Sequence, residues 1–230
     1  MNAQESRLDL TTYLVSAIHD MKNSVGVMTA ELERAMVHTP EGSGLVRAGL
    51  SSTLWQLQRL RNQLVQAMAL YRIHQNFYPF DPSAHAMTDF GAEALAWVEG
   101  LALTRGMEVR AEVTPGLTGF FDRDLVSSAV VQALHNGMRF ARRRVNLTIA
   151  RPNDWLELRV EDDGEGFPEA ILGQPSGPVG RLDHAAGSAG LGLYFSQVVA
   201  ELHRHHERAG RIRLENGGKL GGACFVLQLP

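Results

Sequence analysis

A carboxylate followed by two closely spaced glycines is the feature of this sequence best suited to binding a ligand. Asp162, Gly164 and Gly166 form the pattern D-x-G-x-G directly after residues 155–160, in which apolar and polar side chains alternate. This alternation predicts a half-buried strand, which would fix the carboxylate at its end. There the carboxylate could accept a hydrogen bond from an exocyclic amine such as that of adenine, and the glycines would let the backbone turn beside the ligand. Alone, the pattern fits an ordinary strand and glycine-rich turn equally well.

A histidine with two polar neighbours could carry phosphoryl chemistry. His19, Asp20 and Asn23 fall within about one turn of a predicted helix. An imidazole nitrogen is a nucleophile, and an adjacent carboxylate can hold or deprotonate the ring. A surface histidine on a charged helix would give the same pattern, so spacing alone leaves both interpretations open.

Two further groups supply types of residue that phosphate binding needs. Asn136 offers an amide oxygen, a hard ligand suited to Mg²⁺, and Arg139 follows within one helical turn and could donate to a phosphate. Gly190, Leu191 and Gly192 stand where a loop is predicted to meet a helix, whose free N–H groups and dipole favour an anion. Taken singly, they could equally be a surface amide, a solvated charge and a helix-start turn.

The first part of the chain is predicted to be an antiparallel helical hairpin. Apolar residues recur at steps of three or four over residues 14–35 and again over 50–68, with a turn-forming segment at 38–44. A lone hairpin buries such a seam poorly, so we expect two copies to form a four-helix bundle and the chain to be a homodimer. His19 follows the seam residue Ile18 and should be reachable from solvent.

Prolines in segment 78–82 predict a linker between a helical domain, residues 1–77, and a second domain, residues 78–230. Helices and strands are mixed beyond this linker, which predicts an α+β fold for the whole chain. Helices are predicted over residues 90–103, 122–142 and 192–206, and strands over 107–113, 120–121, 145–150, 155–162, 211–215 and 223–229. Residues 168–189 lack periodicity and are rich in Gly, Pro and Ser, as expected for a lid or a disordered loop.

Composition excludes several classes of protein. A net charge of −3 gives no reason to expect a nucleic-acid or anionic-membrane partner, and the basic run 142–144 fits a solvated helix end. The single cysteine, Cys224, cannot form an internal disulfide, and its apolar neighbours predict a strand core. No apolar run approaches the ~18 residues of a membrane span. We therefore expect a cytoplasmic chain without a membrane segment.

The order of the four motifs resembles the sensor histidine kinases of two-component signalling. Those proteins join a dimerisation and phosphoacceptor hairpin to a GHKL-type ATPase domain, an α/β sandwich with a mixed sheet and helices on one face. The resemblance covers roughly residues 10–230. It implies ATP and Mg²⁺ as cofactors, autophosphorylation of His19, and transfer of the phosphoryl group to an aspartate on the receiver domain of a response regulator.

The resemblance also implies roles for single residues. Asp162 would read adenine beside Gly164 and Gly166. Asn136 would bind Mg²⁺, Arg139 a phosphate, and Gly190, Leu191 and Gly192 the phosphates at a helix start. Asp20 would assist His19, Asn23 would orient the water that hydrolyses phospho-aspartate, and residues 168–189 would be the ATP lid.

Two departures from the family pattern concern the helices that carry these motifs. Ser24 stands where many members have proline after the motif asparagine. Gln132 occupies a position at which hydrolytic relatives carry a water-activating glutamate, which argues against ATP hydrolysis as the main task.

Two alternatives to a histidine kinase share this architecture. A non-catalytic histidine phosphotransfer and docking protein would keep the two-domain shape, but its glycine motifs would be degenerate, and here they are intact. A serine kinase acting on a protein partner through the same ATP fold is disfavoured by the hairpin that carries His19.

Overall fold

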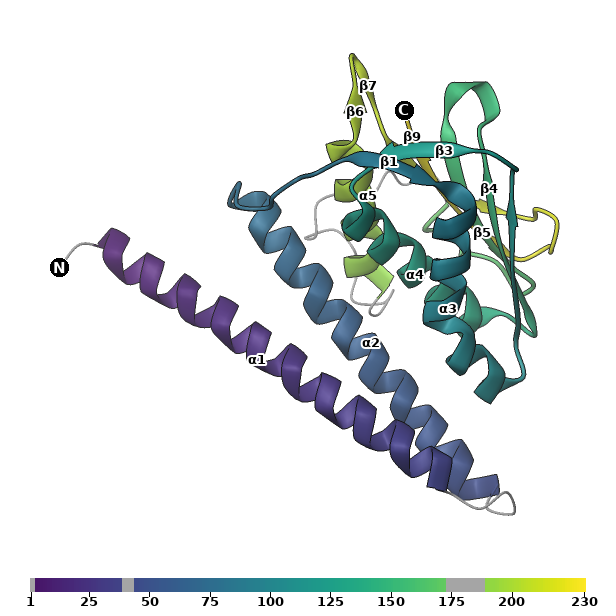
Figure 1. Cartoon of the computed structure of the whole chain (residues 1–230), viewed down its shortest axis with the longest axis horizontal. Coiled ribbons are helices and arrows are strands. Elements are labelled where there is room, and N and C mark those ends of the chain that lie inside the picture. Colours follow the sequence, from purple (N-terminus) through teal and green to yellow (C-terminus); the bar gives the residue numbers. More distant parts are fainter. Residues whose placement is uncertain (1–2, 39–43, 173–188) are drawn as a thin grey trace. The chain divides into compact units, whose positions relative to one another are not determined.

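The computed structural model of this chain describes residues 3–38, 44–172 and 189–230 (Figure 1). They divide into two compact units, Met1–Tyr78 and Pro79–Pro230, which are described here one at a time. Within the expected lid, residues 173–188 lie outside the described part of the chain. No helix of that part has the length and apolarity needed to cross a lipid bilayer.

The first unit is a hairpin of two long helices, α1 (Ala3–His38) and α2 (Gly44–His74), which pack along each other (Figure 1). Val25 of α1 and Leu54 of α2, both predicted seam residues, are buried. Other seam residues remain exposed as large hydrophobic side chains: Met21, Met28 and Leu60. The single chain therefore covers only part of the apolar seam that the sequence predicts.

The second unit is built on a five-stranded mixed sheet whose strands lie in the order β2-β4-β5-β9-β8. Strands β2 and β4 are parallel, and every other neighbouring pair is antiparallel. The bounds of the strands are Glu108–Val113 for β2, Arg144–Ala150 for β4, Leu156–Asp162 for β5, Arg211–Asn216 for β8 and Ala223–Leu229 for β9. The predicted mixed sheet is confirmed.

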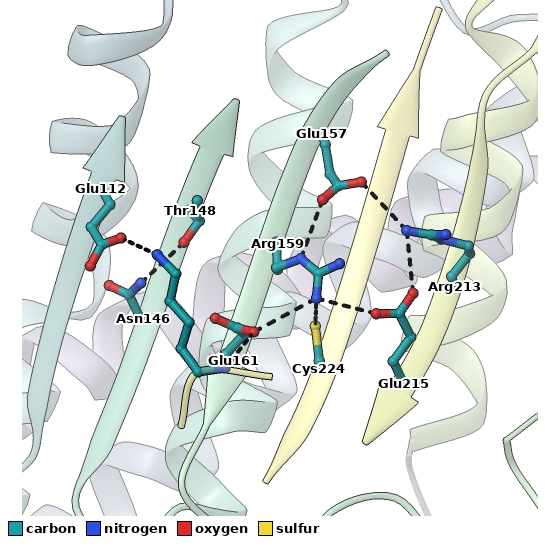
Figure 2. Close-up of polar contacts among 10 residues, drawn as sticks. Glu112, Asn146, Thr148, Glu157, Arg159, Glu161, Arg213, Glu215 and Cys224 are labelled. Carbon is teal, nitrogen blue, oxygen red and sulfur yellow. Dashed lines mark hydrogen bonds and ion pairs between the residues drawn. The ribbon is translucent and has the colours of Figure 1, made fainter. Parts of the chain in front are cut away.

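Three helices, α3 (Met87–Arg105), α4 (Arg123–Phe140) and α5 (Ala189–Leu202), cover one face of this sheet (Figures 1 and 2). The inward side chains of the strands alternate with outward ones, as the period of a strand requires. Leu147, Leu158 and many similar apolar residues are fully buried between helices and sheet. The α+β class expected from the sequence is confirmed.

The other face of the sheet is polar and is organised around Arg159 (Figure 2). Its guanidinium lies 3.2 Å from Glu157 and Glu215, and 3.7 Å from Glu161. It also donates to Sγ of Cys224 at 2.9 Å. Burial raises the pKa of the Cys224 thiol to about 12, so this cysteine stays protonated. Cys224 is buried on a strand, as predicted, but it faces the polar side of the sheet and not the apolar core.

Two short sheets were not foreseen in the sequence. Strand β1 (Ser83–Ala86) pairs with β3 (Thr118–Phe121), where only part of β3 was predicted. Strands β6 (Arg204–His205) and β7 (Arg208–Ala209) form a hairpin. The helix predicted to continue to residue 206 was wrong at this end. It stops at Leu202, and His206 adopts a left-handed φ of 54°, which a helix cannot accommodate.

Candidate functional site

The carboxylate of Asp162 lies at the end of β5 with only 4% of the residue exposed. Its Oδ1 accepts hydrogen bonds from the backbone N–H groups of Gly164 (2.8 Å) and Ala223 (3.2 Å). Its Oδ2 has no hydrogen-bond partner among the residues that the structure describes. Burial raises the pKa of Asp162, while the two N–H groups oppose that rise. One oxygen is therefore fixed, and the other is left to accept from a ligand.

Glycine is required on both sides of this carboxylate. A Cβ at Gly164 would lie 2.4 Å from the carbonyl oxygen of Phe140, and one at Gly222 would lie 2.5 Å from Oδ1 of Asp162. Real Cβ atoms do not approach other atoms so closely. The first contact also joins the D-x-G-x-G turn to the end of α4, so two motifs that are distant in sequence meet in the fold.

Asn216 fixes the rest of this turn and was missed by sequence reasoning. Its Oδ1 accepts from the N–H of Phe167 at 2.7 Å, and its Nδ2 donates to the carbonyl oxygen of Phe167 at 2.8 Å. Gly166, with φ of +90°, lies against the same side chain, where a Cβ would come within 2.8 Å of Oδ1. The only sequence signal was the Asn-Gly-Gly turn after the predicted strand.

Glu161 positions the loop that carries Gly222. The residue is 2% exposed on the polar face of the sheet, and its Oε1 accepts from the backbone N–H of Lys219 at 3.3 Å. The N–H of Gly222 in turn donates to the carbonyl oxygen of Asp162 at 3.0 Å. Neighbouring residues of one strand thus hold the same loop from opposite faces.

The second and fourth motifs also come together. Gln132 on α4 donates from Nε2 to Oδ1 of Asn136 at 3.4 Å. A Cβ at Gly192 would lie 3.0 Å from the same Nε2, so α5 packs against α4 one turn from Asn136. Gly190, Leu191 and Gly192 occupy the first turn of α5, where backbone N–H groups lack helical partners.

Arg139 lies in the last turn of α4 with an exposed side chain. Its guanidinium stacks 5.1 Å from the ring centre of Phe140. That stacking leaves the planar N–H groups at the ring's edge able to reach an anion.

Asp163 forms a second anchor that the sequence did not indicate. Its Oδ1 accepts from three consecutive backbone N–H groups, those of Arg142 (2.9 Å), Arg143 (3.0 Å) and Arg144 (3.0 Å). Burial raises the pKa of Asp163, but the hydrogen bonds from these N–H groups and from the Arg144 side chain lower it by more. The pKa of Asp163 therefore lies below its ordinary value. The helix predicted to reach about residue 142 ends at Phe140 because the following N–H groups bind this carboxylate.

His19, Asp20 and Asn23 form a separate cluster in the first unit. The side chain of His19 is 54% exposed on α1, as predicted. Nδ2 of Asn23 lies 3.2 Å from Nδ1 of His19, and Oδ1 of Asp20 lies 3.9 Å from the same nitrogen. Both neighbours therefore lie near Nδ1, and Nε2 is directed away from them.

The family model for "Histidine kinase-, DNA gyrase B-, and HSP90-like ATPase" matches residues 121–230. This range contains Asn136, Asp162 and the first turn of α5.

Two curated relatives extend the similarity over nearly the whole chain. The sensor protein kinase CarS of Pseudomonas aeruginosa is 27% identical over 219 residues, which cover 92% of this chain and 44% of the relative. The signal transduction histidine-protein kinase AfsQ2 of Streptomyces coelicolor is 24% identical over 235 residues, covering 95% and 41%. This chain spans less than half the length of either relative.

Solved structures share the fold. Histidine kinase AdeS of Acinetobacter baumannii superimposes with a TM-score of 0.57 at 15% identity, over 90% of this chain and 95% of that one. The catalytic domain of histidine kinase ThkA superimposes with a TM-score of 0.54 at 17% identity, over 65% of this chain and 95% of that one.

The anchor at Asp163 predicts a pH-dependent loss of stability. A carboxylate with a depressed folded pKa stabilises the fold above its unfolded pKa, and that stability is lost as the pH falls towards the folded value. We expect Asp163→Asn to lower the free energy of unfolding by about 1–3 kcal/mol at neutral pH. The deficit should shrink below pH ~3.9, where the unfolded carboxyl is protonated.

Urea unfolding of both proteins over this pH range measures the effect. The exposed Asp89→Asn is the control and should show little change at any pH. A deficit that stays constant down to low pH would contradict the role given to the Asp163 charge.

Proposed function

We propose that this chain, whose residues 121–230 belong to the histidine kinase-, DNA gyrase B- and HSP90-like ATPase family, is the core of a sensor histidine kinase. It would phosphorylate His19 with ATP and pass the phosphoryl group to an aspartate of a response regulator. The observation that carries the proposal is that one chain contains both a buried carboxylate suited to adenine, Asp162, and an exposed histidine on a helical hairpin, His19. Homology to sensor histidine kinases supports it.

Membership in this ATPase family implies that the second unit binds ATP. The buried carboxylate of Asp162 suits the adenine amino group, because its Oδ2 is left without a partner among the described side chains and backbone. Gly164 and Gly222 keep this place free of side chains. The first turn of α5 would supply N–H donors for the phosphates, with Arg139 as a further donor.

Mg²⁺ would be held through Asn136. Oδ1 of Asn136 accepts only a long hydrogen bond, 3.4 Å from Gln132, and retains a lone pair for a hard cation. The described residues contain no group of three or more His, Cys, Asp or Glu placed to hold a metal. Mg²⁺ needs few protein ligands, because it keeps most of its sites for phosphate oxygens and water. Bound Mg²⁺ would neutralise phosphate charge during transfer.

The histidine cluster would supply the acceptor. The lone pair on Nε2 of His19 attacks the γ-phosphorus, and the bond from that phosphorus to the bridging oxygen of ADP breaks. Asp20, whose Oδ1 lies 3.9 Å from Nδ1, would have to move closer to accept a hydrogen bond from Nδ1–H and stabilise the positive charge that develops on the ring. A receiver aspartate then attacks the same phosphorus, and the P–N bond breaks to restore the imidazole.

Asn23 would serve the reverse direction of signalling. It lies one turn from His19 on the same face of α1, where its amide could orient the water that attacks phospho-aspartate on the bound regulator. The partner of His19 Nδ1 would then change from Asp20 in the kinase reaction to Asn23 in the phosphatase reaction.

Incubation with γ-labelled ATP and Mg²⁺ should give an acid-labile, alkali-stable label on the chain, as expected for a phosphoramidate. His19→Gln should reduce this label by roughly two orders of magnitude or more, because the nucleophile is removed. His38→Gln, an exposed histidine near the end of the same helix, is the matched control and should label normally.

Labelled protein should then lose its label to an added receiver domain. Label that persists in His19→Gln, or that is stable to acid, would refute the assignment of His19.

Asp162→Ala should weaken ATP binding by about tenfold to a hundredfold, the value of one hydrogen bond to a charged group. Isothermal titration calorimetry with ATP and Mg²⁺ measures the affinity, and circular dichroism checks that the variant remains folded. Asp89→Ala, an exposed acid at the start of α3, should bind as the wild type does. Equal affinities for the wild type and a folded Asp162→Ala would contradict the adenine assignment.

The exposed seam predicts that two hairpins pair. Met21, Met28 and Leu60 are large apolar residues left open on the first unit, and a second copy of the same surface would bury them. The wild type should therefore sediment at about twice the chain mass of 25.3 kDa. The double variant Met21→Glu/Met28→Glu should dissociate, because four charges would enter one interface.

Val37→Glu is the control, since this side chain is 80% exposed near the end of α1. A wild-type protein that sediments as a monomer at micromolar concentration would rule out the paired bundle.

A further inference from the structure

A concave site lies in the second unit, away from the residues assigned to the nucleotide. It is a cavity of about 630 Å³ that adjoins the C-terminal end of α5 and the β6–β7 hairpin. The glycines assigned to phosphate binding lie in the first turn of the same helix, at its other end. A volume of this size is typical of sites for small molecules.

Among the side chains that line this cavity, three are arginines and one, Asp154, is acidic; Pro230 lines it as well. Arg151 donates from Nη2 to the carbonyl oxygen of Thr118 at 2.9 Å, and Arg204 donates from Nε to a carbonyl oxygen of α5 at 3.0 Å. Arg208 stacks on a tryptophan ring, with 5.6 Å between its Cζ and the ring centre. None of the three forms an ion pair with a carboxylate in the described part of the chain. Each retains N–H donors for an anion.

The cavity also has apolar walls. Phe80 is 39% exposed and Phe120 is 64% exposed, and both line it. Exposed aromatic rings next to arginines without a carboxylate partner form a surface that suits a ligand with an apolar body and a negative charge. Inorganic phosphate would leave these rings uncovered.

His203 also lines the cavity, and two hydrogen bonds fix the position of its ring. Its Nδ1 donates to the carbonyl oxygen of Val199 at 2.7 Å, and its Nε2 accepts from the N–H of Asp122 at 2.9 Å. The ring of Phe80 packs edge-on against it at 5.1 Å. Burial lowers the pKa of His203, in keeping with a neutral ring that accepts at Nε2. The histidine thus orients the apolar wall and leaves anion binding to the arginines.

We propose that this cavity binds a small amphipathic organic anion, a carboxylate that carries an aromatic or aliphatic body. The carboxylate would bind Arg151 and Arg208, and the body would lie against Phe80 and Phe120. Charge complementarity selects an anion, the rings select an apolar body, and the volume of the cavity selects a small molecule. This proposal is independent of the kinase assignment, since none of these residues belongs to the nucleotide site or the histidine cluster.

Calorimetric titration of the whole chain with 2-naphthoate tests the proposal. Its neutral isostere 2-naphthamide removes the charge, and acetate removes the body. We expect one saturable site for 2-naphthoate, with an affinity at least about tenfold above that for either control ligand. Arg151→Gln/Arg208→Gln should weaken 2-naphthoate about tenfold or more, and Phe120→Ala several-fold.

Arg110→Gln is the matched control variant, because Arg110 is exposed on β2 and ion-pairs with Glu108 outside the cavity. It should leave 2-naphthoate binding unchanged. Four results would overturn the proposal: no saturable binding, equal binding of 2-naphthamide, an equal loss in Arg110→Gln, or tighter binding of an acidic Phe-containing peptide that displaces 2-naphthoate.

Discussion

The hydrogen bonding of the buried carboxylate of Asp162 is the interaction on which the second unit depends. A charged group can be buried only if hydrogen bonds replace the water that it loses. The backbone N–H groups of Gly164 and Ala223 do this for one oxygen. Gly164 and Gly222, the residue before Ala223, pass so close to Asp162 or α4 that a side chain on either would collide with Asp162 or with the end of α4. The position of one carboxylate thus determines where glycine must occur.

Residues on both faces of the sheet hold the loops around this carboxylate in place. On the helix side, the D-x-G-x-G turn meets the end of α4, and Asp163 binds the three N–H groups that follow this helix. On the polar side, Glu161 and Arg159 hold the loop and strands that bring Gly222 to the carboxylate (Figure 2). Because these contacts start from one strand, β5, a shift of its register would disturb all of them together.

The helical unit has the opposite character. Its polar cluster lies on the surface, where the proposed acceptor of phosphoryl groups could be reached by more than one partner. The side chain of His19 is 54% exposed, and Asn23 and Asp20 both lie near the same ring nitrogen, Nδ1. An exposed histidine and a carboxylate fixed by backbone hydrogen bonds suit the proposed phosphoryl transfer, in which positioning would provide most of the catalysis.

Much of this was accessible from sequence, because local patterns report local structure. The period of three to four gave the long helices, alternation gave β5, and one helical turn placed Asn23 beside His19. The order of the motifs indicated the family that residues 121–230 match. The sequence by itself thus determined the α+β class, the helical hairpin and the candidate residues for chemistry.

Tertiary structure alone decided how these pieces are held. No spacing rule could reveal that Asn216 clamps the turn at Phe167, because its partner is 49 residues away in sequence. The same holds for Asp163, which ends α4, and for the left-handed turn at His206, which replaces the last predicted turn of α5 with a hairpin. Hydrogen bonds between distant segments depend on distances in space, and local periodicity carries no information about them.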